Sequence, residues 1–175
     1  MSQLDEFVTA VTQQSRAAFE EAHGYPFFML QMPETAAKPD EWSFQTRTVV
    51  GPRAGQGRVV LAAGADRYRV FALIKQVGNP WPERVSIGRA RNNDVVLPDN
   101  SVSKLHAHYT QDKEGRMFII DAGSRNGTVV NGRRLASNER APVKIEDTII
   151  IGILQLVLVT SGMVYDLVYS QLDKA

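Results

Sequence analysis

Residues 85–132 carry four short motifs in a fixed order. They are V-S-I-G-R (Val85–Arg89), N-D-V-V-L (Asn93–Leu97), S-V-S-K-L-H (Ser101–His106) and D-A-G-S-R-N-G-T-V-V-N-G (Asp121–Gly132). The first motif places an arginine and a glycine directly after a β-like run, and the last two supply hydroxyl, amide and cationic side chains from turns. Donors of these kinds suit a doubly charged anion together with the backbone of an extended peptide.

The sequence around these motifs has the pattern of an antiparallel β-sandwich. Short runs rich in Val, Ile and aromatic residues alternate with turn residues, as in sandwiches and not in alternating βα units. Asn126-Gly127 and Asn131-Gly132 are strong turn signals, since both residue types tolerate positive φ. We expect strands at Tyr68–Gln76, Arg84–Gly88, Asp94–Leu97, Ala107–Gln111, Met117–Asp121, Thr128–Val130, Val143–Ile145, Thr148–Ile151 and Leu154–Thr160, and a short helix at Ser161–Leu172.

The sequence before this region has a different character. Apolar residues recur at helical spacing over residues 3–22, which predicts an amphipathic helix. Tyr25–Met32 predicts a strand or a docking segment, and residues 33–45 predict a linker with two prolines. Short strands are expected at Thr46–Val50 and Arg58–Ala62, joined by a flexible glycine-rich turn at Gly51–Gly57. The predicted division is an N-terminal extension over 1–65, the sandwich over 66–160, and a C-terminal tail or helix over 161–175.

In their order and separation, the four motifs resemble the forkhead-associated (FHA) family of phosphothreonine-binding domains. The resemblance covers about residues 67–160. It implies a mainly β fold, an FHA-like antiparallel β-sandwich to which this chain adds an N-terminal helical extension and a short C-terminal helix. One departure lies at Glu146, where many members have a glycine before the aspartate.

The resemblance also assigns roles to single residues. Arg89, Ser103 and Lys104 are expected to hold the phosphate. Asn126 is expected to hold the peptide backbone, and Arg125 to contact the phosphate or the residues that follow it. Structural support of the site is expected from Gly88, His106, Ser124, Gly127, Thr128 and Asn131.

The function predicted from these residues is a non-enzymatic module for signal transduction. It would recognise phosphothreonine in an extended peptide and mediate kinase-dependent protein–protein interaction. The expected partners are a threonine-phosphorylated protein or peptide and an upstream Ser/Thr kinase. The alternative is an FHA-fold scaffold or assembly protein that binds partners without phosphate.

Other classes of function find less support in the sequence. Ser103, His106 and Asp121 have the residue types of a hydrolase triad, but the motif order already explains them. His106 and His108 suggest a metal pair, yet with His23 as the one further histidine and no cysteine a closed site lacks ligands. We therefore expect no enzyme activity, no metal and no cofactor.

Composition points to a cytoplasmic protein. The chain has no cysteine, no basic-then-apolar N-terminal segment and no apolar run long enough to span a bilayer. The motif-bearing turns are locally basic, but without a basic helix or an aromatic series we expect neither nucleic acid nor membrane as a partner.

The N-terminal region is acidic, in contrast to the motif-bearing turns. Residues 1–45 hold two basic and seven acidic residues, a net charge of −5. This contrast motivates the hypothesis that the acidic region folds back over the basic site, with Thr35 as a phosphoacceptor.

Overall fold

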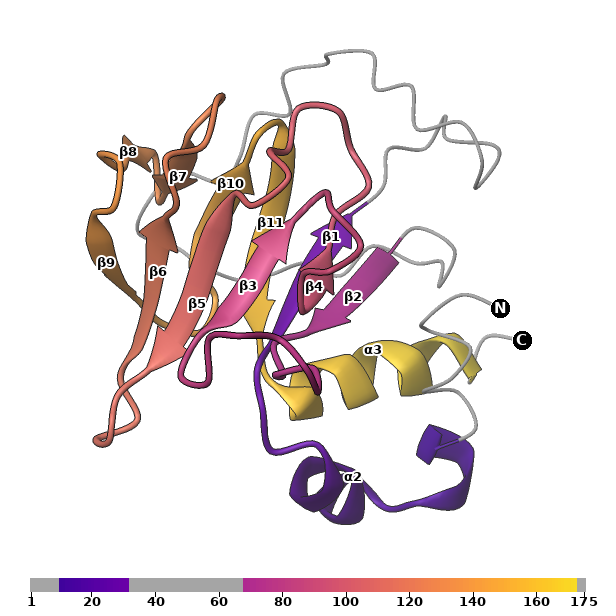
Figure 1. Ribbon diagram of the computed structural model, residues 1–175. Helices are drawn as coiled ribbons and strands as arrows, with labels where there is room; N and C mark the ends of the chain where they lie inside the picture. Colours follow the sequence, from indigo (N-terminus) through magenta and orange to yellow (C-terminus); the bar gives the residue numbers. More distant parts are fainter. Residues whose placement is uncertain (1–9, 32–67, 173–175) are drawn as a thin grey trace.

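The computed structural model of the protein describes residues 10–31 and 68–172. Two β-sheets pack face to face, and a layer of helices lies beside them (Figure 1). The pairing of strands is antiparallel except between β3 and β4, which run parallel. The first sheet has the order β2-β1-β11-β10-β7-β8, with β2 Tyr68–Ala72, β1 Phe27–Gln31, β11 Leu154–Val159, β10 Thr148–Ile151, β7 Thr128–Val130 and β8 Arg133–Arg134. The second has the order β4-β3-β5-β6-β9, with β4 Val95–Val96, β3 Val85–Gly88, β5 Ala107–Gln111, β6 Met117–Asp121 and β9 Arg140–Val143.

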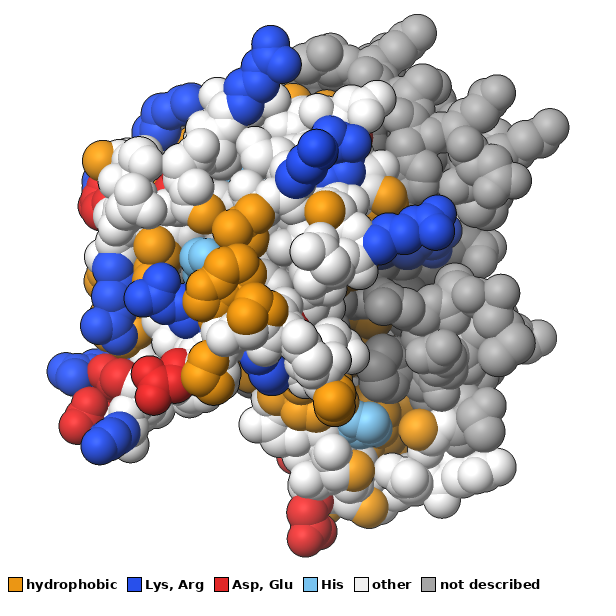
Figure 2. Space-filling model, viewed as in Figure 1, with side chains coloured by type: hydrophobic (Ala, Val, Ile, Leu, Met, Phe, Trp, Pro, Cys, Tyr) orange, Lys and Arg blue, Asp and Glu red, His pale blue; other side chains and the backbone are white. Residues whose placement is uncertain are grey.

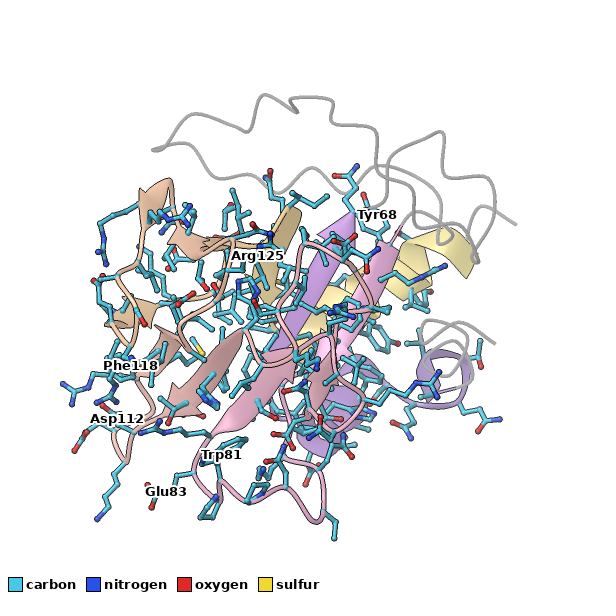
Figure 3. All side chains as sticks on the ribbon, turned by 45° about the horizontal axis from the view of Figure 1, so that its top comes forward. Tyr68, Trp81, Glu83, Asp112, Phe118 and Arg125 are labelled. Atoms are coloured by element: carbon cyan, nitrogen blue, oxygen red, sulfur yellow. The ribbon has the colours of Figure 1, made fainter. Side chains whose placement is uncertain are left out.

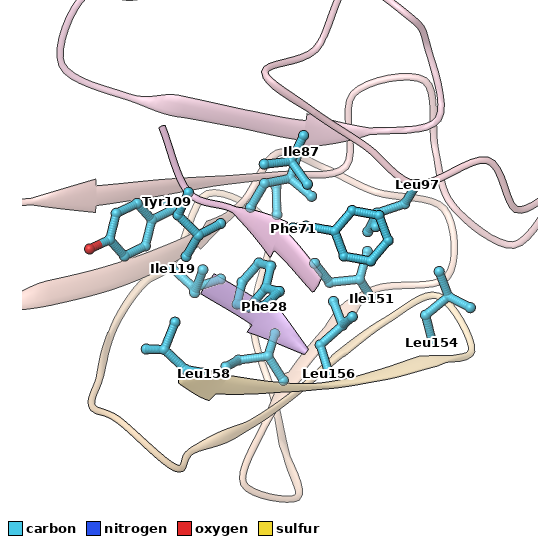
Figure 4. Close-up of a cluster of buried hydrophobic side chains, with 14 of the residues drawn as sticks. Phe28, Phe71, Ile87, Leu97, Tyr109, Ile119, Ile151, Leu154, Leu156 and Leu158 are labelled. Atoms are coloured by element: carbon cyan, nitrogen blue, oxygen red, sulfur yellow. The ribbon is translucent and has the colours of Figure 1, made fainter. Parts of the chain in front are cut away.

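The main hydrophobic core fills the space between the two sheets (Figure 4). Strand periodicity produces it, because successive side chains point to opposite faces. In β11, for example, Leu154, Leu156 and Leu158 are buried and Gln155 is exposed. The core therefore fixes the register of the strands whose ends carry the four motifs.

A second core lies between the first sheet and the helices α2 (Arg16–Ala22) and α3 (Ser161–Leu172). Phe19 of α2 and Leu167 of α3 are both fully buried there. Residues 10–13 are also helical, but the helix predicted over 3–22 is interrupted at Gln14 and Ser15. Ser15 is the N-cap of α2, because its hydroxyl accepts a hydrogen bond from the amide of Ala18 at 3.3 Å.

The fold class and most predicted elements are confirmed. Four predicted strands have the same bounds as β5, β6, β7 and β10, and the predicted closing helix coincides with α3. The strand predicted at Val143–Ile145 had the wrong bounds: β9 ends at Val143, because residues 144–147 form a turn. Asp147 accepts a hydrogen bond from the Lys144 amide at 2.8 Å, and Glu146 adopts φ +73°. The predicted strand Tyr68–Gln76 ends at Ala72, and the sequence analysis missed β8.

The strand β1 lies at a position that the predicted division of the chain did not foresee. It comes from the region predicted as an extension, yet it pairs with both β2 and β11 inside the first sheet. The sandwich therefore includes a strand that lies before residue 66. The fold-back hypothesis predicts that deleting residues 1–45 raises peptide affinity, but this deletion would also remove β1. Substitution of Thr35 tests its role as a phosphoacceptor without removing the strand.

Several predictions fall outside the described residues. They are the linker 33–45 with Thr35, the strands at Thr46–Val50 and Arg58–Ala62, and the turn at Gly51–Gly57. Within the described part, no helix has the length and apolar character needed to cross a membrane.

Candidate functional site

The turn after β3 is shaped by a close approach of backbone to backbone. Gly88 is buried, and a Cβ there would collide with the carbonyl of Lys104 and lie 2.9 Å from Nδ2 of Asn93. Asn93 in turn donates hydrogen bonds to the carbonyls of Ala90, at 2.7 Å, and Lys104, at 2.6 Å. Only glycine fits at position 88 without moving this turn, which presents Arg89.

Arg89 is exposed but fixed at the base of its guanidinium group. Its backbone amide donates to the carbonyl of Ser103 at 2.9 Å, and its Nε donates to the carbonyl of Val102 at 3.2 Å. The two terminal nitrogens have no partner among the described residues. The side chain is thus oriented by the neighbouring loop while most of its donors stay free.

A buried carboxylate supports the same turn from below. Asp94 accepts hydrogen bonds from the amide and hydroxyl of Ser86, from the side chain of Asn79 and from the amide of Gln76, at 2.7–2.9 Å. Burial by itself would raise the pKa of Asp94, but the hydrogen bonds from Ser86 and Gln76 outweigh it and the pKa lies below its ordinary value. Asp94 therefore stays ionised and holds the start of β4 against β3.

His106 links the loop before β5 to the loop before β7. It is fully buried; its Nδ1 accepts the Ser103 amide at 3.0 Å, and its Nε2 lies 3.1 Å from the Gly127 carbonyl. This pair of contacts requires the neutral ring with its proton on Nε2. Burial lowers the pKa of His106 below its ordinary value, although the bond to Gly127 opposes this. The support role predicted for His106 agrees with this geometry.

The loop between β6 and β7 is organised by Asp121. One carboxylate oxygen accepts the amides of Gly123 and Ser124, and the other accepts the hydroxyls of Ser124, at 2.6 Å, and Thr128, at 2.7 Å. Burial would raise the pKa of Asp121, but the bonds from Ser124 and Thr128 prevail and the pKa is lowered. The carboxylate thus acts as a fixed anchor beneath an otherwise exposed loop.

The tip of this loop carries Arg125 and Asn126, both exposed. Arg125 lies at the end of the sandwich opposite to Glu83 and Asp112 (Figure 3). Its amide donates to the hydroxyl oxygen of Ser103 at 3.0 Å, and Nδ2 of Asn126 donates to the carbonyl of Ser101 at 2.7 Å. These bonds join the loop tip to the loop before β5. We call residues 89–94, 97–106 and 122–127 together the recognition end.

The structure places the five predicted contact residues on these adjoining turns, although their roles stay predictions. Of the predicted support residues, Asn131 alone bonds elsewhere among the described residues. Its side-chain oxygen accepts the Thr148 amide at 3.0 Å, which fixes the turn between β7 and β8. The sequence analysis missed the organising roles of Asp121, Asn93 and Asp94. An aspartate followed by Gly and Ser two and three residues later is a known turn signal, and it would have found the first.

The residues of the considered triad make separate contacts. The Ser103 hydroxyl accepts from Arg125, the His106 ring bonds to backbone atoms, and Asp121 binds Ser124 and Thr128. These contacts do not form a relay of the Ser–His–Asp kind. In residues 10–31 and 68–172, no three His, Asp or Glu side chains gather in a way that suits a metal ion.

The recognition end is rich in unpaired cations. On the face shown in Figure 2, the Lys and Arg side chains along the upper edge have few acidic neighbours, whereas those at the lower left lie among most of the acidic side chains. Arg89, Arg91, Lys104 and Arg125 of this end are exposed, as is Arg134 of the neighbouring strand β8, and none has a carboxylate partner among the described residues. An anion that approaches this end meets an attractive field and fixed donors.

Comparison with known proteins identifies the domain. The family model of the FHA domain matches residues 85–152, which span the recognition end and strands β3 to β10. The chain contains an FHA domain. The resemblance inferred from the motifs is therefore confirmed.

Several known proteins are similar in sequence or structure to this chain. The oxoglutarate dehydrogenase inhibitor of Corynebacterium diphtheriae is 33% identical over 82 residues, 47% of this chain and 52% of that protein. An ABC transporter ATP-binding/permease protein of Mycobacterium tuberculosis is 40% identical over 125 residues, 71% of this chain and 13% of that protein. The chain thus covers less than two thirds of the length of either relative. A solved structure of the N-terminal FHA domain of Saccharomyces cerevisiae Rad53p, in complex with a phosphothreonine peptide, is 23% identical. The match covers 48% of this chain and 73% of that one, with a TM-score of 0.42.

Proposed function

We propose that the recognition end binds phosphothreonine in an extended peptide and so mediates kinase-dependent protein–protein interaction. The observation that carries the proposal is the arrangement of Arg89 and Ser103. The Arg89 guanidinium is anchored through Nε, and it stands beside Ser103. Among the described residues, neither the terminal nitrogens of Arg89 nor the hydroxyl proton of Ser103 has a partner.

The phosphate would be held by charge-assisted hydrogen bonds. A phosphothreonine brings nearly two negative charges and three strong acceptor oxygens. The hydroxyl oxygen of Ser103 already accepts from Arg125, so its proton is available to a phosphate oxygen. Arg89 supplies two terminal nitrogens, and Lys104 adds an exposed point charge. Each such bond contributes about 1.5–3 kcal/mol, so three or four support binding near 1 μM, about −8 kcal/mol.

The peptide backbone would be held by Asn126. Its amide nitrogen is used by the carbonyl of Ser101, whereas its oxygen has no partner among the described residues. That oxygen is a fixed acceptor for a backbone N–H beside the phosphothreonine. Arg125 projects from the same tip and would contact the phosphate or the residues that follow it.

The biological partners follow from the same chemistry. The ligand is a threonine-phosphorylated protein, and an upstream Ser/Thr kinase must create it. The FHA domain acts as a non-catalytic reader in the cytoplasm.

The test is fluorescence-polarisation binding to a degenerate phosphothreonine peptide library, with phosphoserine and unphosphorylated libraries as controls. We expect the wild type to bind the phosphothreonine library selectively, and Arg89→Ala to weaken binding at least about tenfold. Arg91→Ala is the matched control, because Arg91 is an exposed arginine of the same turn without a partner among the described residues, and we expect a change below about twofold. A folded wild type that binds all three libraries equally, or none, would favour the scaffold alternative.

A further inference from the structure

Two neighbouring arginines in β8 differ in how their charges are satisfied. Arg133 is paired, with its guanidinium 2.6 Å from a carboxylate oxygen of Glu139. Arg134 has no carboxylate partner among the described residues, and its side chain lies on the opposite side of the strand. The pair therefore provides one neutralised and one unsatisfied cation within the same two-residue strand.

The unsatisfied arginine is held against the recognition end. The space that a side chain at Gly127 would need is filled by the guanidinium of Arg134, whose Nε lies 2.9 Å from the position of a Cβ there. Gly127 has φ +81°, and its carbonyl is fixed by His106. Because Gly127 directly follows Asn126, the charge of Arg134 stands beside the residue that would hold the peptide backbone.

Among the described residues, the acids of the adjoining loops already have other partners. Three described aspartates lie in or next to these loops, and all three are buried and accept hydrogen bonds: Asp94, Asp99 and Asp121. Glu139 is paired with Arg133. An exposed guanidinium that is positioned by packing but unpaired offers a fork of donors to a carboxylate or a phosphate.

The geometry points to Arg134 as a second anion-binding position, so that the preferred ligand is a phosphothreonine peptide with an additional anionic group. This inference rests on the proposed function, because the phosphothreonine at Arg89 and Ser103 places the peptide across Asn126. The additional group is a carboxylate of Asp or Glu, or a second phosphate, at a flanking position that reaches Gly127.

The experiment is a positional scan, in which one anionic residue is placed at each flanking position of a phosphothreonine peptide whose other flanking residues are neutral. One series moves Glu and the other moves phosphoserine, one position at a time, and each peptide is titrated by fluorescence polarisation. At one or two adjacent positions, we expect the anion to improve wild-type affinity about fivefold, the upper range for an exposed ion pair. Comparison of the two series distinguishes a carboxylate ligand from a phosphate ligand.

Arg134→Ala and Arg134→Gln should abolish this gain and leave affinity for the neutral parent peptide within about twofold. Arg133→Ala is the matched control and should keep the gain, because Arg133 is paired with Glu139 on the other side of the strand. Melting curves check that all three variants are folded.

Three results would overturn the inference, and they differ in what else they imply. A wild type that gains nothing from any added anion, or a gain that persists in both Arg134 variants, removes this inference and leaves the proposed function intact. Failure of the neutral phosphothreonine parent to bind the wild type removes the proposed function and this inference with it.

Discussion

The recognition end and the helical layer of this protein, formed by α2 and α3, use charged and buried groups in opposite ways. In the helical layer, Arg16 is paired with Glu20 and Asp166, and apolar side chains fill the space beneath. At and directly beneath the recognition end, buried polar groups such as His106 and Asp121 hold the backbone, and the exposed cations there have no carboxylate partner in the part of the chain that the structure describes. This difference is the one expected if the helical layer serves stability and the recognition end serves ligand binding.

The helical layer should affect stability and not recognition. Phe19 is fully buried and packs against His23 and Tyr165, with ring centroids 4.5 and 5.6 Å away. We expect Phe19→Ala to lower the free energy of unfolding by about 3–5 kcal/mol, measured by urea denaturation. Phosphopeptide affinity of the folded variant should stay within about twofold of the wild type.

Two further variants make this test of the helical layer informative. Phe19→Leu is the milder change should the alanine variant not fold, and Glu21→Ala, at an exposed position of α2, should change stability by less than about 0.5 kcal/mol. Weakened peptide binding in a folded Phe19 variant would show that the helical layer is coupled to the recognition end and does not serve stability alone.

The recognition end should show its own dependence on pH. Burial lowers the pKa of His106 below 6.5, so the unfolded chain binds a proton at a pH where the folded chain does not. Stability from this group is therefore constant above pH 6.5 and falls as the pH drops from 6.5 through the folded pKa. Uptake of this one proton lowers the free energy of unfolding by at most about 1.4 kcal/mol per pH unit.

His108 complicates the measurement, because burial lowers its pKa too. The pH series of urea denaturation is therefore run on His108→Gln, in which we expect a loss of stability below pH 6.5 to remain. An NMR titration should show the His106 ring more than half neutral at pH 6.5, because its pKa is lowered. A ring half-protonated there would mean that the bond from the Ser103 amide to Nδ1 does not hold in solution.

The sequence placed the residues of the recognition end on turns, as the structure has them, but it missed part of the surrounding architecture, and there is a physical reason. Arg89, Ser103 and Asn126 lie on turns whose chemistry is local, so short motifs carry the information. The position of β1 between β2 and β11 depends on pairing between distant segments, which no local pattern records. Likewise, the helical spacing of apolar residues predicted one helix over 3–22. Ser15 interrupts this helix because its side chain caps the start of α2.

Side-chain contacts across loops were the other part that the sequence did not reveal. Arg134 packs on Gly127, and this contact depends on how the pairing of β7 and β8 brings the two residues together. The four donors of Asp121, by contrast, all lie within residues 123–128. Residue types alone also allowed Asp121 in a hydrolase triad, and the geometry shows the contacts that it makes instead.

The smallest predicted effect concerns Glu146, in the turn between β9 and β10. Glu146 adopts φ +73°, a conformation that glycine accepts freely and that costs other residues roughly 1 kcal/mol. We expect Glu146→Gly to raise the free energy of unfolding by about 0.5–1 kcal/mol without changing peptide affinity, because no recognition residue contacts this turn among the described residues. Glu146→Ala is the matched control: it removes the same charge but keeps a Cβ, so it should not relieve the strain. Equal stabilisation by both substitutions would assign the effect to charge, and a change in peptide affinity would mean that strain in this turn reaches the recognition end.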